Sequence, residues 1–290
     1  MALYPRESNK EMLTNKKVLS AGTLKNIAVI TMVIDHLGAT LVYEFEQKNF
    51  QDIGIDGFVS MWMRIIGRIA FVLFAFLLTE GFVYTSSKKK YALRLCAGAV
   101  ISEIPYDLVE SGEIVNIWAQ NIFFTLLLGF CIIWILDSMK ENSIFVKVLV
   151  VLLGLVLSEM LCCEYGVMGV GLIVAFYCLR GKMILYPVIL VECFIGHLVN
   201  DLVHNLVTIN QEMIRKGSGI YLFSWNEMSL ITKVNFERRL YQTMPGILVA
   251  LILIFFYSKK KGKQLPKAFY YMFYPVHLIA IFFLMKIFFS

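Results

Sequence analysis

Long apolar runs, separated by short polar segments, follow one another along nearly the whole chain. Most of these runs approach the ~20 residues that an α-helix needs to cross a bilayer, and the sixth and eighth are shorter. The pattern predicts nine transmembrane helices, at residues 24–43, 62–85, 91–109, 119–137, 144–161, 165–179, 183–199, 244–257 and 268–288.

The composition agrees with a membrane protein. The chain has 290 residues, of which 59% are hydrophobic and 17% are charged, whereas a soluble domain carries about 25% charged residues. We therefore predict an all-α polytopic bundle that forms a single integral membrane domain over residues 1–290, with no soluble module. The longest connection, 200–243, is expected to cover a site or bind a partner. No internal repeat is evident, which argues against an inverted-repeat transporter.

Basic residues collect in alternate connections, which predicts the orientation of the helices. The segment 1–17 is polar and basic without a signal-peptide cleavage pattern, so the first span is expected to be its own insertion signal. The alternation places the N-terminus in the cytoplasm and the C-terminus outside. The basic residues before the first span, and after the second and eighth, are Arg6, Lys10, Lys16, Lys17, Lys25, Lys88, Lys89, Lys90, Arg94, Lys259, Lys260, Lys261, Lys263 and Lys267.

The net charge of +6 and the six cysteines bear on two classes of partner, nucleic acids and metal ions. Cytoplasmic anchors at an anionic leaflet account for the positive charge, so no nucleic-acid partner is expected. The cysteines fit no zinc-binding spacing, and no metal is expected. The adjacent Cys162 and Cys163 are interpreted as small apolar packing residues.

Two ionisable residues, Asp35 and His36, stand side by side within the first predicted span. A charge at the centre of a membrane helix costs at least ~2.5 kcal/mol, so such residues usually face a polar cavity and take part in function. At 1.5 Å per residue, His36 lies about 16 Å beyond Lys25, and His277 of the ninth span lies about 14 Å in from the same side. The two histidines therefore share a depth. Either they perform chemistry, or each forms a hydrogen bond that holds the bundle together.

The second and third spans carry further charges. Arg64 and Arg68 lie one turn apart on one helical face, and Glu80 lies nearer the cytoplasmic end of the same span. Glu103 and Asp107 bracket a proline in the third span. One interpretation is a buried ion pair of Arg68 with Glu103 or Asp107 that fixes the packing of these two spans; the other is a direct role in chemistry. In the sixth span, Gly166, Gly169 and Gly171 form a small-residue face typical of close helix packing.

Several of these residues fall within motifs that resemble one family. The motifs are LKNIA (24–28), MVIDHLG (32–38), GRIAF (67–71), SEIPYDL (102–108), NIFFTLLLG (121–129) and FYPVHL (273–278). In this order they are similar to the TraX family, and the match covers nearly the whole chain. The resemblance implies a membrane acetyltransferase of the kind that N-acetylates pilin, related to enzymes that use cytoplasmic acyl-CoA.

The first motif also resembles membrane acyltransferases that O-acetylate surface polysaccharides. Those enzymes carry an arginine and a histidine in the first span with ten residues between them, and Lys25 and His36 have this spacing. Lysine keeps the positive charge but lacks the bidentate guanidinium group. Val72 stands where many TraX-like sequences have proline.

The resemblance implies roles for individual residues. Acyl transfer needs a base, a stabilised oxyanion and a positioned thioester. His36 is the first candidate for the base because histidine titrates near neutrality, and His277 is the second; Asp35 would orient or tune one of them. The candidate donor-binding residues are Lys25, Asn26, Arg68 and Tyr274, with Lys88–Lys90 and Arg94 as further phosphate ligands, and the supporting residues are Glu103, Asp107 and Glu80. Direct transfer and a ping-pong route through acetyl-histidine both stay open.

The partners implied by the resemblance are membrane lipid, acetyl-CoA as donor substrate, and an acceptor that is a protein N-terminus, a surface sugar or a small amine. A homodimer is a further alternative, and the location is a bacterial cytoplasmic membrane. Two other classes of function stay open: a transporter or flippase that uses the midplane ionisable residues as a proton relay, and a non-catalytic assembly protein.

Overall fold

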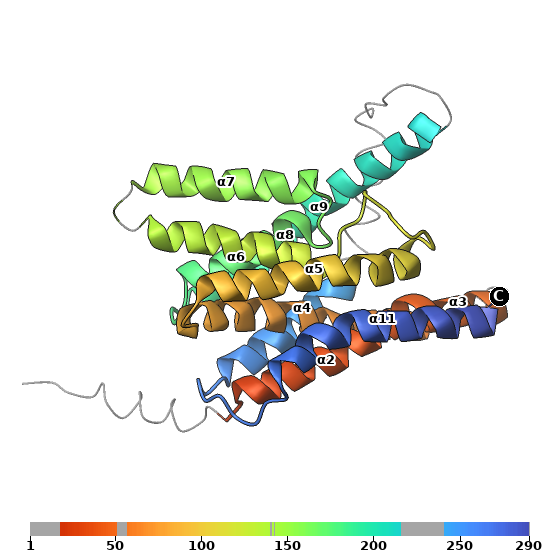
Figure 1. Cartoon of the computed structure of the whole chain (residues 1–290), viewed down its shortest axis with the longest axis horizontal. Coiled ribbons are helices and arrows are strands. Elements are labelled where there is room, and N and C mark those ends of the chain that lie inside the picture. Colours follow the sequence, from red (N-terminus) through yellow and green to blue (C-terminus); the bar gives the residue numbers. More distant parts are fainter. Residues whose placement is uncertain (1–17, 51–56, 140, 142, 216–240, 290) are drawn as a thin grey trace, which may run out of the picture.

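The computed structural model describes residues 18–50, 57–139, 141, 143–215 and 241–289, and within this part of the chain the protein is helical without a β-strand (Figure 1). Two isolated bridges join Leu19 to Tyr257 and Gln120 to Cys163. The elements are α2 (Ala21–Leu37), η1 (Gly38–Val42), α3 (Tyr43–Phe50), α4 (Phe58–Tyr84), α5 (Lys88–Glu110), α6 (Ile122–Ser138), α7 (Ile144–Met160), α8 (Gly166–Cys178), α9 (Leu185–Arg215), an unlabelled helix at Tyr241–Phe255, and α11 (Lys267–Phe289).

Four of the helices begin at a side chain that caps them. Ser20, Ser87, Asn121 and Ser143 are the N-cap residues of α2, α5, α6 and α7, and each accepts a hydrogen bond from a backbone N–H in the first turn. Such caps satisfy donors that have no partner inside the helix. The boundaries of these helices are therefore encoded locally, by polar residues at the ends of apolar runs.

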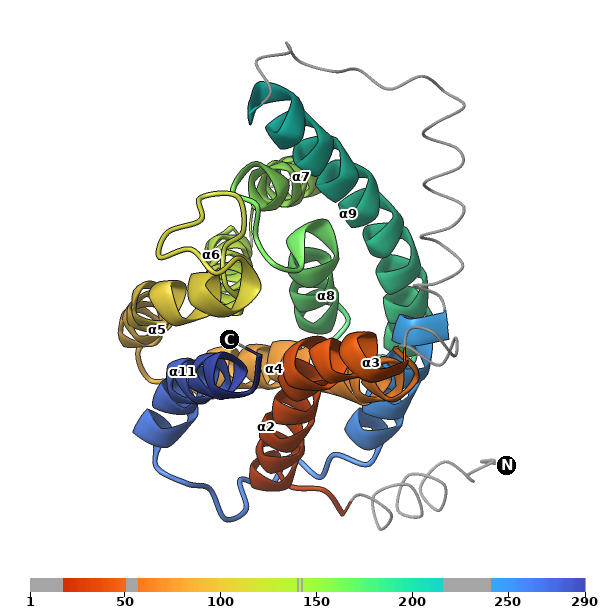
Figure 2. The ribbon, with the colours of Figure 1, turned by 90° about the vertical axis from the view of Figure 1, so that its right-hand side faces the viewer.

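Helix α8 lies in the middle of one half of the bundle, with α4, α6, α7 and α9 around it (Figure 2). Glycines permit this close packing. A Cβ atom on Gly169 would lie 2.5 Å from Cγ2 of Thr125, and one on Gly171 would lie 2.3 Å from Oε1 of Glu192. Gly169 therefore faces α6 and Gly171 faces α9, so close packing at these glycines is confirmed, whereas the single small-residue face that the sequence predicts is not formed.

The other half of the bundle brings the two ends of the chain together. Helix α2 packs along α4, and α11 lies against both α5 and α2 (Figures 1 and 2). The helix at Tyr241–Phe255 approaches α4 closely, because a Cβ on Gly246 would lie 2.4 Å from the carbonyl oxygen of Ile65. This arrangement places the first and last predicted spans side by side.

The all-helical bundle is confirmed, and three helical stretches are both long and apolar enough to cross a membrane. They are Ala21–Phe50, Phe58–Tyr84 and Lys267–Phe289. Four further apolar helices are shorter, at Ile122–Ser138, Gly166–Cys178, Leu185–Val199 and Tyr241–Phe255. The number of nine spans and the orientation of the N-terminus stay predictions.

Two boundaries differ from those that the sequence predicts. The first helical stretch continues past residue 43 to Phe50, through the π-helical turn η1 that follows His36; such turns often occur at functional sites. Helix α9 continues through residues 200–215, the first part of the predicted connection, because the polar residues there do not interrupt the helix. Residues 241–243 likewise begin the next helix, and residues 216–240 of that connection lie outside the described residues.

Candidate active site

A cavity of about 560 Å³ lies between α2, α4, α5, α6 and α11. Its wall includes the ionisable residues Lys25, Asp35, His36, Glu80, Arg94, Glu164, Lys259, Lys261 and Lys267, and the tyrosines Tyr84, Tyr91, Tyr165, Tyr257, Tyr270, Tyr271 and Tyr274. Apolar residues of α4 and α6 fill much of the remaining wall. A cavity of this size, mostly apolar with a few polar groups, is typical of a binding site for a small molecule.

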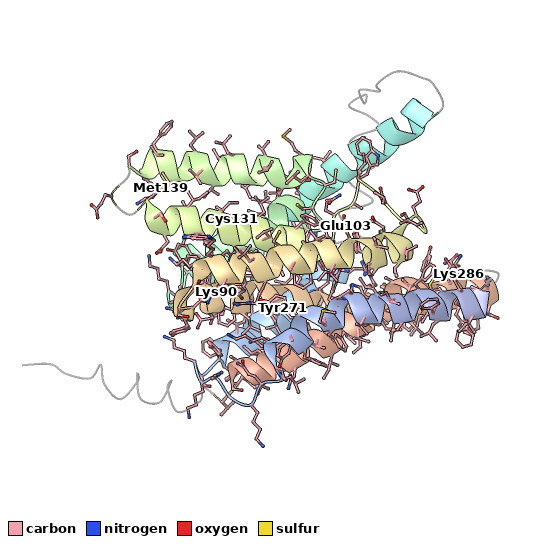
Figure 3. The ribbon with its side chains drawn as sticks, in the orientation of Figure 1. Lys90, Glu103, Cys131, Met139, Tyr271 and Lys286 are labelled. Atoms are coloured by element: carbon pink, nitrogen blue, oxygen red, sulfur yellow. The ribbon has the colours of Figure 1, made fainter. Side chains whose placement is uncertain are left out.

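The two ends of the cavity differ in charge. Lys88 at the start of α5 pairs with Asp137 at the end of α6, so these two ends lie on one side of the bundle, where α11 also begins (Figure 1). Figure 3 shows Lys90 at this side and Tyr271 farther along, between α5 and α11. Glu164 lies in the loop that α7 and α8 form at the opposite side (Figure 1). The cavity therefore has one basic end, where Lys25, Arg94, Lys261 and Lys267 lie, and one end at the α7–α8 loop.

His36 of α2 contacts His277 of α11. The distance from Nδ1 of His36 to Nε2 of His277 is 2.6 Å, and the two rings stack with centroids 4.9 Å apart. Tyr274, one turn before His277, presents its ring edge to His36 at a centroid distance of 5.8 Å. The shared depth that helix spacing predicts for the two histidines is confirmed, and they form one unit.

The hydrogen bonds of His277 determine how protons are arranged in this unit. Nδ1 of His277 lies 2.9 Å from the carbonyl oxygen of Phe273, which can only accept, so Nδ1 carries a proton. In neutral His277 the other nitrogen, Nε2, is then an acceptor, and Nδ1 of His36 donates to it. The lone pair of His36 is left on Nε2. A hydrogen bond at one ring nitrogen commonly fixes the state of the other in this way.

Asp35 binds two arginines of α4. Its Oδ2 accepts from Nη1 of Arg64 at 2.7 Å, and its Oδ1 accepts from Nη2 of Arg68 at 3.1 Å. The carboxylate has only 9% of its side chain exposed. The expected pair of Arg68 with Glu103 or Asp107 is wrong, because α2 rather than α5 supplies the carboxylate that faces Arg68. Asp35 lies against arginines, and no hydrogen bond joins it to either histidine ring.

Gly67 explains how Asp35 reaches both arginines. A Cβ atom on Gly67 would lie 2.0 Å from Oδ1 of Asp35 and 2.2 Å from its Cβ. The aspartate side chain therefore occupies the space above a glycine that stands between the two arginines in the sequence. Any larger residue here would displace the carboxylate or separate α2 from α4.

The arginine cluster extends to the α7–α8 loop. Nη1 of Arg68 donates to the hydroxyl of Tyr165 at 3.2 Å, and the Tyr165 ring stacks on Phe71 with centroids 3.9 Å apart. Glu164 precedes this tyrosine, and its buried Oε2 has no hydrogen-bond partner within the described part of the chain. Burial, followed by the charges of Glu110 and Asp35, raises the pKa of Glu164 to about 8.

At the basic end, Lys25 and Asn26 contact the start of α11 and the residues before it. Nζ of Lys25 donates to Oε1 of Gln264 at 3.2 Å and lies 5.3 Å from the centroid of the Tyr270 ring. The hydroxyl of Tyr270 donates to Oδ1 of Asn26 at 3.1 Å. Lys25 lines the cavity, whereas Asn26 does not.

Backbone bonds hold the lysine-rich segment 259–261 at the start of α2. The N–H groups of Ala21 and Gly22 donate to the carbonyl oxygens of Lys260 and Lys261, at 2.9 and 3.0 Å. A Cβ on Gly22 would lie 1.9 Å from the carbonyl oxygen of Lys263, so only glycine fits there. The segment and Lys25 together concentrate positive charge at the basic end of the cavity. Positively charged groups there favour the binding of phosphate.

The three supporting residues have structural partners. Glu103 accepts hydrogen bonds from the backbone N–H and the side-chain amide of Asn121, which caps α6. Asp107 accepts from the backbone N–H of Asn116 at 2.9 Å. Glu80 accepts from Nε of Arg180 at 2.6 Å, and this hydrogen bond raises the pKa of Arg180. The structure thus draws Asp35, His36, His277 and Tyr274 together and leaves Glu103 and Asp107 at the packing of α5 against the loop before α6.

Sequence reasoning missed Arg64, Tyr165 and Glu164 as members of the site. Arg64 was visible as the partner of Arg68 on one helical face, but nothing indicated which carboxylate it meets. For Glu164, the one available signal was a carboxylate in a short loop between two apolar helices. The described residues contain no group of three or more His, Cys, Asp or Glu placed to hold a metal ion.

Comparisons with known proteins agree with the order of the sequence motifs. The family model described as TraX protein matches residues 20–285. A probable fimbrial assembly protein FimC, serogroup H1, from Dichelobacter nodosus is 26% identical over 280 residues, which cover 90% of this chain and 94% of that protein. No solved structure matches.

Proposed function

The chain belongs to the TraX family, and we propose that it is an integral membrane acyltransferase that moves an acetyl group from acetyl-CoA to an amine or hydroxyl acceptor. The observation that carries this proposal is the contact of His277 with His36, which lines a cavity whose far end is basic. A paired histidine supplies a base, and the basic end supplies ligands for the phosphate groups of the donor.

The donor enters from the basic end, which the positive-inside pattern assigns to the cytoplasm. Lys25, Lys261, Lys267 and Arg94 line this end and bind the phosphates by charge-assisted hydrogen bonds. Eleven residues of helix, or about 16 Å, separate Lys25 from His36. The extended arm of the donor spans this length along the apolar wall and brings its thioester to the histidines.

Nε2 of His36 acts as the general base, because its lone pair is the one that the hydrogen-bond chain leaves available. The acceptor N–H or O–H gives its proton to Nε2 while the nitrogen or oxygen attacks the thioester carbonyl carbon. The tetrahedral intermediate then collapses, the carbon–sulfur bond breaks, and the proton on Nε2 passes to the leaving sulfur. His277 orients the ring and stabilises the imidazolium, as the third member of a catalytic triad does.

Tyr274 is the candidate for stabilising the oxyanion. Its hydroxyl is buried on the cavity wall, and its ring lies against both histidines, 5.8 Å from His36 and 5.5 Å from His277 between centroids. A buried donor aimed at a developing negative charge lowers the barrier more than the same donor in water. The pair of Asp35 with two arginines holds α2 against α4 and so fixes the position of His36.

The protein acts in a bacterial cytoplasmic membrane in this proposal, with the acceptor arriving from the outer side. A role in fimbrial assembly, which the name of the Dichelobacter nodosus relative states for that protein, suits an acceptor carried by a surface protein. A protein N-terminus, a surface sugar and a small amine are the acceptors to be screened.

The proposal is tested by calorimetric binding of acetyl-CoA to the purified protein. Lys25→Ala is expected to weaken binding by roughly 10-fold, the loss of one hydrogen bond to a charged group, whereas His36→Ala binds normally and loses turnover. Lys286→Ala, at the opposite end of α11, is the matched control and binds as the wild type does. Absence of binding by the folded wild type would refute the proposal and favour a carrier that moves its substrate unchanged.

A further inference from the structure

We propose that Glu164 is the residue that binds the acceptor, and that the acceptor reaches the acetyl group through the α7–α8 end of the cavity. This inference rests on the proposed acyl transfer and adds to it an entrance and a recognition group. No motif of the sequence includes Glu164, and its position follows from the tertiary structure alone.

The backbone of the α7–α8 loop is held in place at this end. The carbonyl oxygen of Cys162 accepts from the N–H of Gln120 at 2.9 Å, and the N–H of Glu164 donates to the carbonyl oxygen of Gln120 at 3.0 Å. The Phe71 ring stacks on Tyr165 and holds the next residue against α4. A carboxyl group on such a fixed loop is preorganised for binding.

The carboxyl group of Glu164 has one unpaired oxygen. Among the residues that the structure describes, none donates a hydrogen bond to its buried Oε2, although Glu164 lines the cavity. An unpaired polar atom in such a place costs free energy unless a ligand completes it. The N–H or O–H of an acceptor supplies the missing hydrogen bond.

The neighbouring arginines bind other groups and leave the Glu164 carboxyl available to an acceptor. Arg64 and Arg68 both bind Asp35, and Arg68 uses its remaining Nη1 on Tyr165. The two arginines favour the ionised form of Glu164, whereas burial and the charges of Glu110 and Asp35 favour the protonated form and raise its pKa to about 8. The carboxyl group is thus mostly protonated at neutral pH and retains an oxygen for the N–H or O–H of an acceptor.

The cavity joins this carboxyl to the catalytic pair. Glu164 and His36 line the same cavity. Arg68 of α4 links their neighbours, because it donates to Tyr165 of the loop and to Asp35 of α2. The donor occupies the basic end, so the α7–α8 end is the side from which a second substrate meets the thioester. The two substrates then approach from opposite sides of the bundle.

The first test is kinetic, with ethanolamine as a probe that carries both an amine and a hydroxyl. Glu164→Gln is expected to raise KM for ethanolamine at least 10-fold and to leave acetyl-CoA binding unchanged. The control is Glu159→Gln, five residues before Glu164, where the carboxylate accepts from the N–H of Val167 and does not line the cavity. A KM within twofold of wild type, or an equal loss of acetyl-CoA binding, would overturn the proposal.

The second test needs no turnover. In a chain whose six cysteines are replaced by alanine, Glu164→Cys is expected to react with a membrane-impermeant methanethiosulfonate reagent added opposite the basic end, and Lys261→Cys with reagent added at the basic end. Labelling of both from one side, or no labelling of Glu164→Cys, overturns the proposed entrance. Failure of acetyl-CoA binding in the wild type would instead remove the acyltransferase function and leave this result standing.

Discussion

Nδ1 of His36 lies 2.6 Å from Nε2 of His277, although 241 residues separate them in the chain. The carbonyl oxygen of Phe273 fixes the proton of His277 on Nδ1. Because that leaves His277 as the acceptor of this contact, the two rings act as one base with its lone pair on His36. Four predictions follow from this arrangement and from its surroundings.

Removal of either histidine is expected to reduce acyl transfer without unfolding the bundle. His36→Ala loses the base, which contributes roughly 10²–10⁴-fold in rate, and His277→Ala loses the ring that orients it. Because the two act as a unit, the double variant is expected to be no slower than His36→Ala alone. The measurement is the rate of thiol release from acetyl-CoA with an accepted acceptor; losses that multiply would show that the rings act separately.

Asp35→Asn is expected to destabilise the protein by about 3–5 kcal/mol, because it leaves two guanidinium groups without their carboxylate. Asp137→Asn is the comparison, since Asp137 and its partner Lys88 have 25% and 30% of their side chains exposed, and a pair of that kind contributes about 1 kcal/mol or less. Denaturant unfolding in detergent measures both. Equal losses of unfolding free energy would mean that the Asp35 cluster is no more buried in solution than the pair of Asp137 with Lys88.

Gly67→Ala is expected to destabilise the contact of α2 with α4 by about 1–3 kcal/mol, because the new Cβ would overlap the Asp35 side chain. Gly98→Ala is the control. Its Cβ would lie 3.2 Å from the ring of Phe123, much farther than the 2.0 Å approach to Asp35, and alanine gains about 1 kcal/mol in helix propensity. The thermal midpoint of unfolding should therefore fall further in Gly67→Ala than in Gly98→Ala. A Gly67→Ala variant as stable as the wild type would contradict the position of Asp35.

The stability of the folded protein is expected to fall between about pH 4.5 and pH 8 through Glu164. Burial raises the pKa of this carboxyl from 4.5 to about 8, Glu110 and Asp35 add to the rise, and Arg68 and Arg64 oppose it. In that window the folded protein binds more protons than the unfolded chain, so stability decreases as pH rises. Glu164→Gln should have a shallower decrease in thermal midpoint between pH 5 and pH 8; an unchanged slope would show that Glu164 does not titrate there.

Much of the bundle was readable from the sequence because its information is local. Apolar runs, serine and asparagine caps and the closely packed glycines of α8 each depend on residues within a few turns of one another. The depth of His36 and of His277 was also readable, since helix rise converts sequence distance into distance along the bundle axis. Boundaries were less certain where polar residues continue a helix, as in α9 beyond residue 199.

Which residues meet across helices was decided only by the tertiary structure. The sequence shows that Arg64 and Arg68 share a face, but the rotation of α2 about its axis, with Gly67 leaving room for a side chain, determines that Asp35 and not Glu103 faces them. Glu164 enters the site because the α7–α8 loop is bonded to Gln120. The sequence by itself thus determined the helices and the depth of their polar residues, whereas the pairing of those residues depends on helix rotation and loop position, which no local pattern encodes.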